Sequence, residues 1–321
     1  MKAAVIQEAG KAPVYGEFRE PEAGSGEEVV AVCAAAMTHL TRARASGQHY
    51  SSEGGYPLVP GVDGVGLTRG GKRVYFVMPE PPFGAMAECS LVEPGRCIEL
   101  PAGLDEVTAA ALANPGMSAW AALRERAQLK HGEVVLVNGA TGAGGRLAVQ
   151  LAKYLGASRV IATGRDVQAL EQLRSLGADD VIAFEDTGSE GSWQSFEEAV
   201  QQRFAERIDV VVDYLWGASA RTLLIAIARS VEEAHPVRFV QVGSVSGHEL
   251  LLPAAALRSS ALMLMGSGLK SVALNRLLAA IAGTFSAHVE IGLQLPILSV
   301  PLAQVATYWD KATRERVVFT L

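Results

Sequence analysis

From about residue 119 onward, short apolar runs alternate with segments in which apolar residues recur every three or four positions. Continuous apolar runs are typical of strands buried on both faces, and their alternation with helices predicts a parallel sheet covered on both sides. The predicted strands are Val134–Asn138, Val160–Thr163, Val181–Phe184, Ile208–Tyr214 and Arg238–Val242. The predicted helices are Gly145–Leu155 and Val167–Leu176, and each is followed directly by a glycine, a residue that often ends a helix.

The flanking regions have a different pattern. Residues 1 to about 115 contain short runs broken by Gly and Pro, which is typical of β-strands joined by turns. The tail holds a predicted helix, Val272–Gly283, and a last strand, Arg316–Thr320, which we expect to fold back onto the first region. We therefore predict an α/β protein with two domains. One is a Rossmann domain with a doubly wound parallel sheet over residues 118–255, and the other is a β-rich domain made of residues 1–117 and 256–321.

Composition narrows the class of protein. The chain has 321 residues, of which 49% are hydrophobic, enough for two cores. Its net charge of −6 argues against nucleic acid as a partner, because binding to phosphate backbones usually requires a basic face. The most apolar stretches, Leu223–Ala228 and Ala261–Met265, are too short to span a membrane and are interpreted as core. Three cysteines and a start without a long apolar segment lead us to expect a cytoplasmic protein that does not associate with membranes.

The segment VNGATGAGG joins a predicted strand to a predicted helix and contains four glycines. In a dinucleotide site an early glycine permits the tight turn, a middle one lets the backbone approach the pyrophosphate, and a late one lets helix and strand pack closely. The pyrophosphate then lies over free N–H groups at the positive end of the helix dipole. We therefore predict that this turn binds a dinucleotide through Gly139, Ala140, Thr141, Gly142, Ala143, Gly144 and Gly145.

The end of the second strand of this domain, VIATGRD, bears on the choice of dinucleotide. A site for NADH usually carries an acid about 20 residues after the glycines, which binds the ribose hydroxyls. Here Thr163 and Gly164 take that place and Arg165 follows, so that a guanidinium is available to a 2′-phosphate. We predict NADPH as the cofactor, with these three residues among those that bind it. Asp166 is either a displaced acid or, as we favour, the N-cap of the next helix.

Several motifs occur in an order that covers nearly the whole chain. They include MKAAVIQEAG at the start, PLVPGVDGVG at residues 57–66, GAMAECSLV at 84–92, LGADDVI at 176–182 and FVQVGSVSG at 239–247. In this order they resemble the medium-chain dehydrogenase/reductase superfamily, specifically its zinc-free quinone oxidoreductase (zeta-crystallin-like) branch. The resemblance implies a GroES-like catalytic domain beside the Rossmann domain, with the nicotinamide in a cleft between them. It also implies a homodimer, and quinones or other α,β-unsaturated carbonyls as hydride acceptors.

The resemblance also locates the positions at which zinc-dependent alcohol dehydrogenases of the superfamily bind their metal. The cysteine position falls on Thr38, the acid that follows it on Thr41, and the histidine position on Val62. Neither threonine nor valine is a plausible zinc ligand, so we predict no metal. Without a Lewis acid an alcohol proton is hard to remove, whereas hydride delivery to an already polarised acceptor needs less help.

Further candidate residues complete the predicted site. On the substrate side the resemblance implies Thr38, Tyr50 and Tyr56, of which the tyrosines are placed to donate a hydrogen bond to a developing oxyanion. Tyr214 ends a predicted strand, at the edge where open α/β sheets bind ligands. The other cofactor-binding residues that the resemblance implies are Ser118, Val242, Gly243, Ser244, Gly266, Ser267 and Gly268.

Three rival functions compete with this one. A short-chain reductase is rejected, because those enzymes place the glycine turn near the N-terminus and use a Tyr-x-x-x-Lys pair. None of the tyrosines in this chain is followed by a lysine four residues later. Enoyl reduction within the same superfamily and a non-catalytic NADPH-binding role both stay open.

Overall fold

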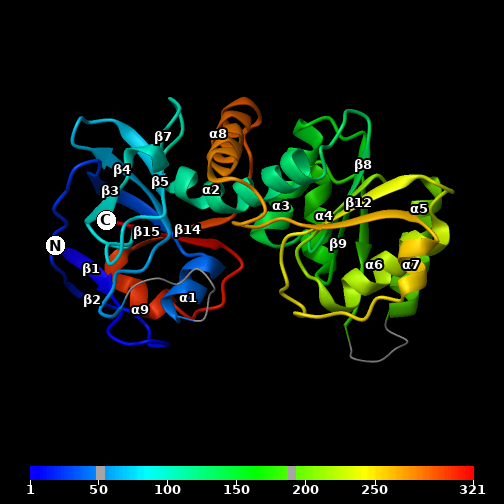
Figure 1. Cartoon of the computed structure of the whole chain (residues 1–321), viewed down its shortest axis with the longest axis horizontal. Helices are drawn as coiled ribbons and strands as arrows, with labels where there is room; N and C mark the ends of the chain where they lie inside the picture. The colour runs from blue at the N-terminus through cyan, green and yellow to red at the C-terminus, as the bar shows by residue number, and fades with distance from the viewer. Residues whose placement is uncertain (48–54, 187–192) are drawn as a thin grey trace. The chain divides into compact units, whose positions relative to one another are not determined.

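The computed structural model describes residues 1–47, 55–186 and 193–321 of the chain (Figure 1). Within these residues the chain divides into two compact units. The first unit contains Met1–Asn114, His288–Glu290 and Leu295–Leu321. The second unit contains Pro115–Ala287 and Ile291–Gln294.

The first unit is rich in β-structure, as predicted. Its strands are β1 (Lys2–Val5), β2 (Val14–Glu17), β3 (Glu28–Ala36), β4 (Asp63–Thr68), β5 (Arg73–Val77), β6 (Cys89–Val92), β7 (Cys97–Glu99), β14 (Ile297–Pro301) and β15 (Arg316–Thr320). Its short helices are α1 (His39–Ala45), η1 (Pro94–Arg96), η5 (Leu302–Gln304) and α9 (Val305–Tyr308). A mixed sheet has the strand order β14-β15-β3-β4-β5-β7, and β6 also pairs with β3. Since β15 pairs antiparallel with β3, the expectation that the tail folds back onto the first region is confirmed.

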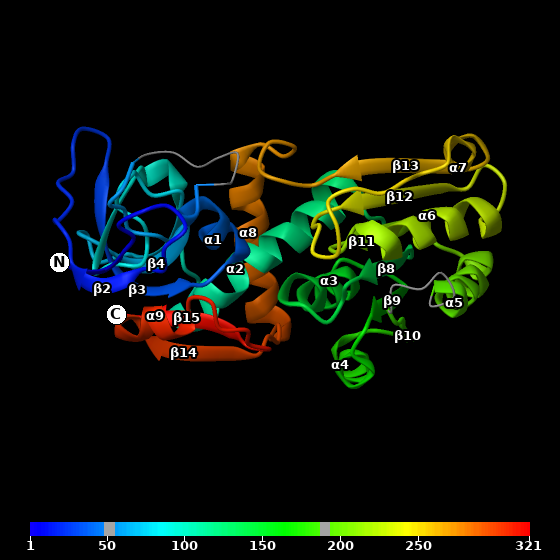
Figure 2. The same ribbon diagram turned by 90° about the horizontal axis from the view of Figure 1, so that it is seen from below.

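The second unit is a parallel α/β structure. Its strands are β8 (Val134–Asn138), β9 (Arg159–Gly164), β10 (Asp180–Ala183), β11 (Val210–Asp213), β12 (Pro236–Gln241) and β13 (Ala261–Gly266). Among the described residues they form one sheet with the order β10-β9-β8-β11-β12-β13, which can be followed in Figure 2. The helices of this unit are η2 (Ala121–Arg126), α3 (Ala143–Tyr154), α4 (Val167–Gln172), η3 (Leu173–Leu176), α5 (Gln194–Glu206), α6 (Gly217–Ser230) and α7 (Ala254–Arg258). Two longer helices, α2 (Glu106–Trp120) and α8 (Leu274–Ile291), contain residues of both units.

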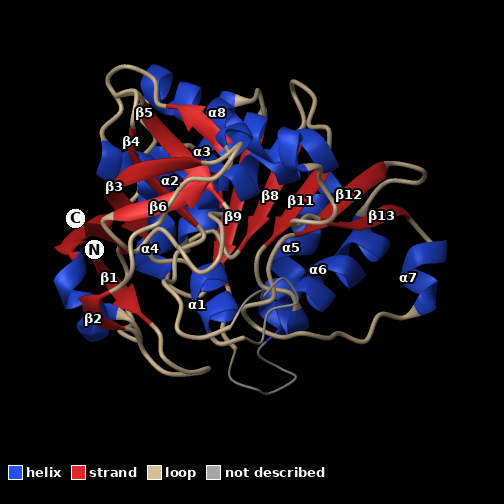
Figure 3. Ribbon diagram, turned by 60° about the vertical axis from the view of Figure 1, so that its left-hand side comes forward, coloured by secondary structure: helices blue, strands red, loops and turns tan. Residues whose placement is uncertain are grey.

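Apolar packing covers both faces of the parallel sheet. Helices α5 and α6 bury Phe196, Phe204 and Leu223 against one face, together with Phe239 of β12. Helix α3 packs against β8 and β9 on the other face. Both faces of a strand can be covered in this way, because successive side chains point to opposite faces. Figure 3 shows the strands of this sheet lying between helices. The prediction of a doubly wound parallel sheet is therefore confirmed.

The predicted boundary at residue 255 was wrong for the segment that follows it. Residues 261–266 form β13, which pairs in parallel with β12 and extends the sheet of the second unit. The interpretation of Ala261–Met265 as core was also wrong, because Met263 and Leu264 on this edge strand are 42% and 41% exposed. None of the described helices combines the length and the apolar character needed to cross a membrane.

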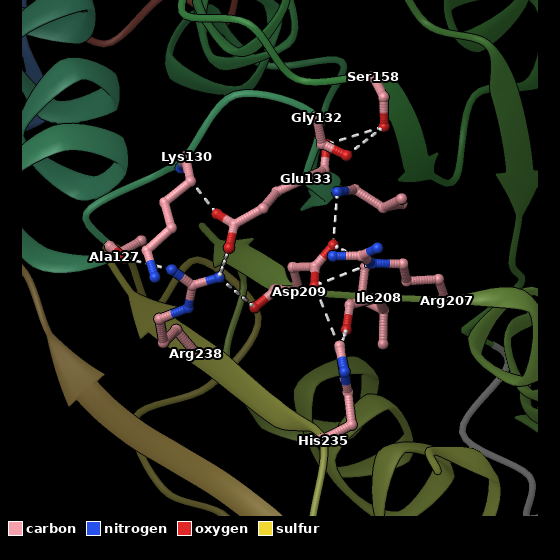
Figure 4. Close-up of polar contacts among 11 residues, drawn as sticks. Ala127, Lys130, Gly132, Glu133, Ser158, Arg207, Ile208, Asp209, His235 and Arg238 are labelled. Carbon is pink, nitrogen blue, oxygen red and sulfur yellow. Dashed lines mark hydrogen bonds and ion pairs between the residues drawn. The ribbon is translucent and has the colours of Figure 1, made fainter.

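A cluster of charged residues ties together the amino ends of three strands in the second unit (Figure 4). Asp209, buried directly before β11, accepts a hydrogen bond from the backbone N–H of Val134 at 2.8 Å. Arg238 of β12 donates to the Glu133 carboxylate at 2.6 Å, and the side chains of this pair are only 12% and 11% exposed. Arg207 contacts Asp209 from the solvent side, with 55% of its side chain exposed. The cluster therefore joins β8, β11 and β12 at the end opposite to the glycine turn.

We expect Arg238→Met to lower the free energy of unfolding of the second unit by about 3 kcal/mol, because it leaves the buried Glu133 carboxylate without its cation. Arg207→Met is the matched control and should cost less, since its guanidinium is largely in solvent. Calorimetric unfolding of both variants measures the difference. If both variants lost the same free energy of unfolding, burial of the ion pair would not explain its contribution to stability.

Candidate functional site

The glycine turn between β8 and α3 has the geometry expected of its spacing. Gly139 has a φ of +83°, which favours glycine and turns the chain sharply after the strand. A Cβ added at Gly145 would lie 2.3 Å from the Gly139 carbonyl oxygen, so this glycine permits close packing of helix and strand. Gly142 is the N-cap of α3 and is exposed, and a Cβ there would meet no atom closer than 3.9 Å. Open space at this backbone position is what an approaching phosphate requires.

Only part of the predicted turn is available to a ligand. The N–H groups of Gly139 and Ala140 both donate to the Thr163 carbonyl, at 3.1 and 2.9 Å. Ala140 and Thr163 are fully buried, so their predicted role as direct cofactor contacts is not supported by the fold. The accessible part is residues 141–144, where the first N–H groups of α3 have no carbonyl partner within the helix. An anion placed there would also lie at the positive end of the helix dipole.

Tyr214 lies over the start of α3. A Cβ added at Gly144 would lie 2.7 Å from the Cε1 atom of Tyr214. The Tyr214 hydroxyl is buried and makes no hydrogen bond of standard geometry with any described residue. Burial raises the pKa of Tyr214, while the neighbouring Ser118 hydroxyl, which donates to the Pro115 carbonyl at 2.9 Å, partly offsets this. The structure thus brings Ser118 and Tyr214 together and leaves a protonated phenol, a hydrogen-bond donor, beside the turn.

A polar network at the carboxyl ends of the strands was not found from the sequence. The Asn138 side chain, fully buried at the end of β8, accepts from the Thr163 hydroxyl at 2.7 Å and donates to Asp213 at 2.8 Å. Asn138 also donates to the Ser219 hydroxyl of α6 at 3.0 Å. The network joins β8, β9, β11 and α6. Its only signal in the sequence was a polar residue at the end of each of three apolar runs.

The later segments predicted to bind the cofactor follow the same edge of the sheet. The N–H groups of Val242 and Gly243 donate to the Asp213 carbonyl at 2.7 and 3.2 Å. A Cβ on Gly243 would lie 2.6 Å from the Tyr214 carbonyl oxygen, so the backbone approaches closely here, and Ser244 comes next. Gly266, Ser267 and Gly268 follow at the end of β13, where the Gly266 carbonyl accepts a hydrogen bond from Arg126 at 2.7 Å. These contacts position both segments.

The end of β9 presents Arg165 to solvent. Gly164 is the last residue of β9, and Arg165 directly after it is exposed. Asp166 is the N-cap of α4, because its side chain accepts a hydrogen bond from the Ala169 N–H at 3.0 Å. The interpretation of Asp166 as a cap is therefore confirmed. Its carboxylate is engaged with the backbone of α4.

The substrate-side candidates lie in the first unit and already have partners there. The Thr38 hydroxyl caps α1, accepting from the Thr41 N–H at 2.7 Å and donating to the Thr41 hydroxyl at 2.8 Å. The Tyr56 hydroxyl donates to the Ala45 carbonyl at 2.8 Å. Tyr50 lies outside the described residues. Thr38 and Tyr56 therefore support local structure, and a role for either in catalysis stays a prediction.

A small pocket of about 70 Å³ opens in the first unit. Four prolines, Pro60, Pro79, Pro81 and Pro82, line it together with Val62, while Thr41 and Arg44 contribute polar groups. Two of the positions that hold or neighbour zinc in related dehydrogenases, Thr41 and Val62, thus face one pocket. Within the described part of the chain no group of three or more His, Cys, Asp or Glu side chains is arranged to hold a metal ion.

Comparison with known proteins adds independent information. The family model of zinc-binding dehydrogenases matches residues 144–273, a range that contains neither Thr38 nor Val62. A probable NADPH-dependent quinone reductase of Emericella nidulans is 27% identical over 339 residues, covering 93% of each chain. An NADPH-dependent alkenal/one oxidoreductase of Arabidopsis thaliana is 32% identical over 181 residues, 51% of this chain and 46% of the relative. The crystal structure of a quinone oxidoreductase from Thermus thermophilus, also determined with NADPH, superposes with a TM-score of 0.79 at 26% identity and covers 100% of both chains.

We expect Gly145→Ala to lower the free energy of unfolding of the second unit by about 1–3 kcal/mol, because the added methyl group overlaps the Gly139 carbonyl. Gly142→Ala is the matched control in the same turn and should have a much smaller effect, since its Cβ enters open space. Calorimetry on the two proteins without ligand measures the difference. Similar losses for both variants would show that the turn is packed differently.

Proposed function

The chain belongs to the medium-chain dehydrogenase/reductase superfamily, and we propose on this premise that it is an NADPH-dependent reductase of quinones or other α,β-unsaturated carbonyls. The observation that carries the proposal is the turn at Gly142, which is open to solvent and leads directly into α3. A buried Tyr214 hydroxyl that makes no hydrogen bond of standard geometry with any described residue lies beside it. The named activities of the fungal and plant relatives support the same chemistry.

The residues of the second unit fit a dinucleotide. The backbone of residues 141–144 would hold the pyrophosphate, with the half-buried Tyr214 ring packed against Gly144 beside it. Bound NADPH supplies a hydride. The backbone of Val242, Gly243 and Ser244 would then orient the nicotinamide, together with residues 266–268, because both segments end strands on the carboxyl edge of the sheet.

Arg165 would distinguish NADPH from NADH. It is exposed directly after β9, and its neighbour Asp166 is engaged as the N-cap of α4. A guanidinium forms charge-assisted hydrogen bonds with a phosphate, whereas it gains little from a ribose hydroxyl. The contact with the 2′-phosphate is expected to contribute roughly 1.5–3 kcal/mol.

Hydride transfer is proposed to proceed without a metal. Thr38 and Val62 supply no zinc ligand. A conjugated acceptor lets the developing charge spread to an oxygen several bonds away, so that a hydrogen-bond donor can suffice. Elemental analysis that finds one zinc per chain would contradict this part of the proposal.

Both quinones and enones are retained as acceptors. The fungal relative is named as a quinone reductase, and the plant relative acts on alkenals and enones by its name. Both acceptors have the same conjugated arrangement, in which a hydride adds at carbon and charge collects at oxygen. Enoyl thioesters belong to the same chemical class and are included in the test below.

A homodimer joined along β13 is part of the proposal. Among the described strands β13 pairs only with β12, so its other edge has unpaired backbone groups, and Met263 and Leu264 on it are exposed. Light scattering should therefore give twice the chain mass of 33.8 kDa. Leu264→Lys should shift the protein toward monomer, while Leu67→Lys, at a residue of equal exposure in the first unit, should not. A monomeric wild-type protein would contradict this arrangement.

A cytoplasmic location is also proposed. The chain has three cysteines, Cys33, Cys89 and Cys97, and all three are free. Disulfides are rare in the cytoplasm, where thiols are kept reduced. Free thiols at every cysteine position are compatible with that compartment.

NADPH oxidation measured against a panel of quinones, enones and enoyl thioesters tests the function. We expect turnover with at least one acceptor class. Arg165→Ala should raise the KM for NADPH about ten- to a hundredfold, in line with the loss of one charge-assisted contact. The activity with NADH should hardly change.

Arg174→Ala is the matched control for the loss of a cation from the same surface. Arg174 donates hydrogen bonds to the Glu171 carboxylate and to the Asp179 carbonyl. In Arg174→Ala the KM for NADPH and the activity with NADH should both stay the same. If Arg165→Ala weakens the use of both cofactors equally, Arg165 does not read the phosphate. NADPH binding without consumption of any acceptor would favour a non-catalytic role.

A further inference from the structure

A buried carboxylate at the end of β11 organises the loop that lies over the glycine turn. Asp213 has no exposed surface and accepts hydrogen bonds from the N–H groups of Leu215 at 3.1 Å and Trp216 at 3.1 Å. It also accepts from the Asn138 side chain at 2.8 Å. Because it is fully buried, Asp213 cannot touch a ligand itself. Its effect must pass through the groups that it holds.

The loop that Asp213 holds, residues 214–216, has a strained backbone. Trp216 has φ 58° and ψ −155°, a conformation that a residue with a side chain rarely adopts. Such a backbone conformation persists only when the surrounding structure holds it in place. The Asp213 carboxylate holds this conformation of Trp216, since it accepts a hydrogen bond from the Trp216 N–H.

The loop 214–216 contacts both segments proposed to bind the dinucleotide. Toward the glycine turn, a Cβ on Gly139 would lie 2.8 Å from Leu215, and the Tyr214 ring lies against Gly144. Toward the other segment, the Tyr214 and Leu215 carbonyls accept hydrogen bonds from Val245 and Ser246 at 3.4 and 2.9 Å. The loop therefore connects the proposed pyrophosphate and nicotinamide segments.

We propose that Asp213 is a positioning residue for NADPH: by capping the loop 214–216 it fixes the Tyr214 ring and the 242–246 backbone in the conformation that binds the dinucleotide. The inference rests on the proposed function, because it concerns the same ligand. It assigns Asp213 control over affinity, although Asp213 touches neither cofactor nor acceptor.

The surroundings of Asp213 make this control dependent on pH. The groups that face it are uncharged: the Asn138 amide from β8, the Ser219 hydroxyl bonded to that amide, and the N–H groups of Leu215 and Trp216. Burial raises the pKa of Asp213 to about 6, and the donated hydrogen bonds limit the rise. Below this pH the protonated carboxyl loses acceptor capacity, so the loop and the affinity that depends on it should weaken as the pH falls.

Calorimetric titration with NADP⁺ at pH 7.5 and 5.5 tests the proposal, with Asp213→Asn as the main variant. In either orientation the new amide NH₂ faces another N–H donor, Asn138 or Trp216. We expect the Kd to rise about tenfold at pH 7.5, which corresponds to the loss of about one hydrogen bond. The ligand phosphate titrates equally in both proteins. The variant should therefore show a smaller weakening between the two pH values than the wild type does.

Two further variants separate positioning from general damage. In the exchange Asn138→Asp with Asp213→Asn, the new amide donates to the new carboxylate, and the Kd should return to within about threefold of the wild type. Asp209→Asn is the matched control, because Asp209 is a buried carboxylate at the opposite end of the same strand. It should lower the unfolding temperature and leave the Kd for NADP⁺ unchanged.

The outcomes distinguish this inference from the proposed function. If the wild type does not bind NADP⁺, the proposed function fails. If the wild type binds and Asp213→Asn binds equally well with the same pH profile, the positioning role is overturned. Should Asp213→Asn fail to fold, hydrogen exchange of the wild type replaces it. The Leu215 and Trp216 amides should then lose protection between pH 7.5 and 5.5 relative to the Val211 amide, and retained protection would overturn the proposal.

Discussion

The buried side chain of Asn138 ties together the carboxyl ends of three neighbouring strands, and the functional edge of the second unit depends on this connection. Its amide accepts from Thr163 on β9 and donates to Asp213 on β11 and Ser219 on α6. A buried amide with a missing partner would cost about 1–3 kcal/mol, so each strand end is held to its neighbours. The glycine turn, the Arg165 segment and the loop 214–216 each leave the sheet directly after one of these residues.

Each glycine of the turn has a different role, which follows from the geometry of the backbone at its position. Gly139 supplies the left-handed turn, and Gly145 permits contact between helix and strand. Gly142 alone faces open space, so only there does the missing side chain serve a ligand. The N–H groups of Gly139 and Ala140 are already bonded to β9, which confines ligand binding to residues 141–144 at the start of α3.

Local patterns predicted the sheet, and contacts between distant residues explain what the sequence did not reveal. Strands β8 and β15 have the bounds that the sequence predicted. The edge strand β13 was assigned to the wrong domain, because its apolar run looks like any core segment until its pairing with β12 is known. Thr163 was expected to meet the cofactor, yet its partner is Asn138, 25 residues away. Likewise, the position of Tyr56 in the sequence does not show that its hydroxyl donates a hydrogen bond to the Ala45 carbonyl.

The place of β15 between β14 and β3 has a consequence for synthesis of the chain on the ribosome. All strands of the second unit come from one continuous stretch, residues 134–266, so its sheet can form as soon as that stretch has emerged. The first unit begins earlier in the sequence but needs residues 297–320 to complete its sheet. The part of the protein made first is therefore finished last. The end of β3 at Ala34–Ala36 has to wait for β15 during translation, when unpaired strand edges are prone to aggregate.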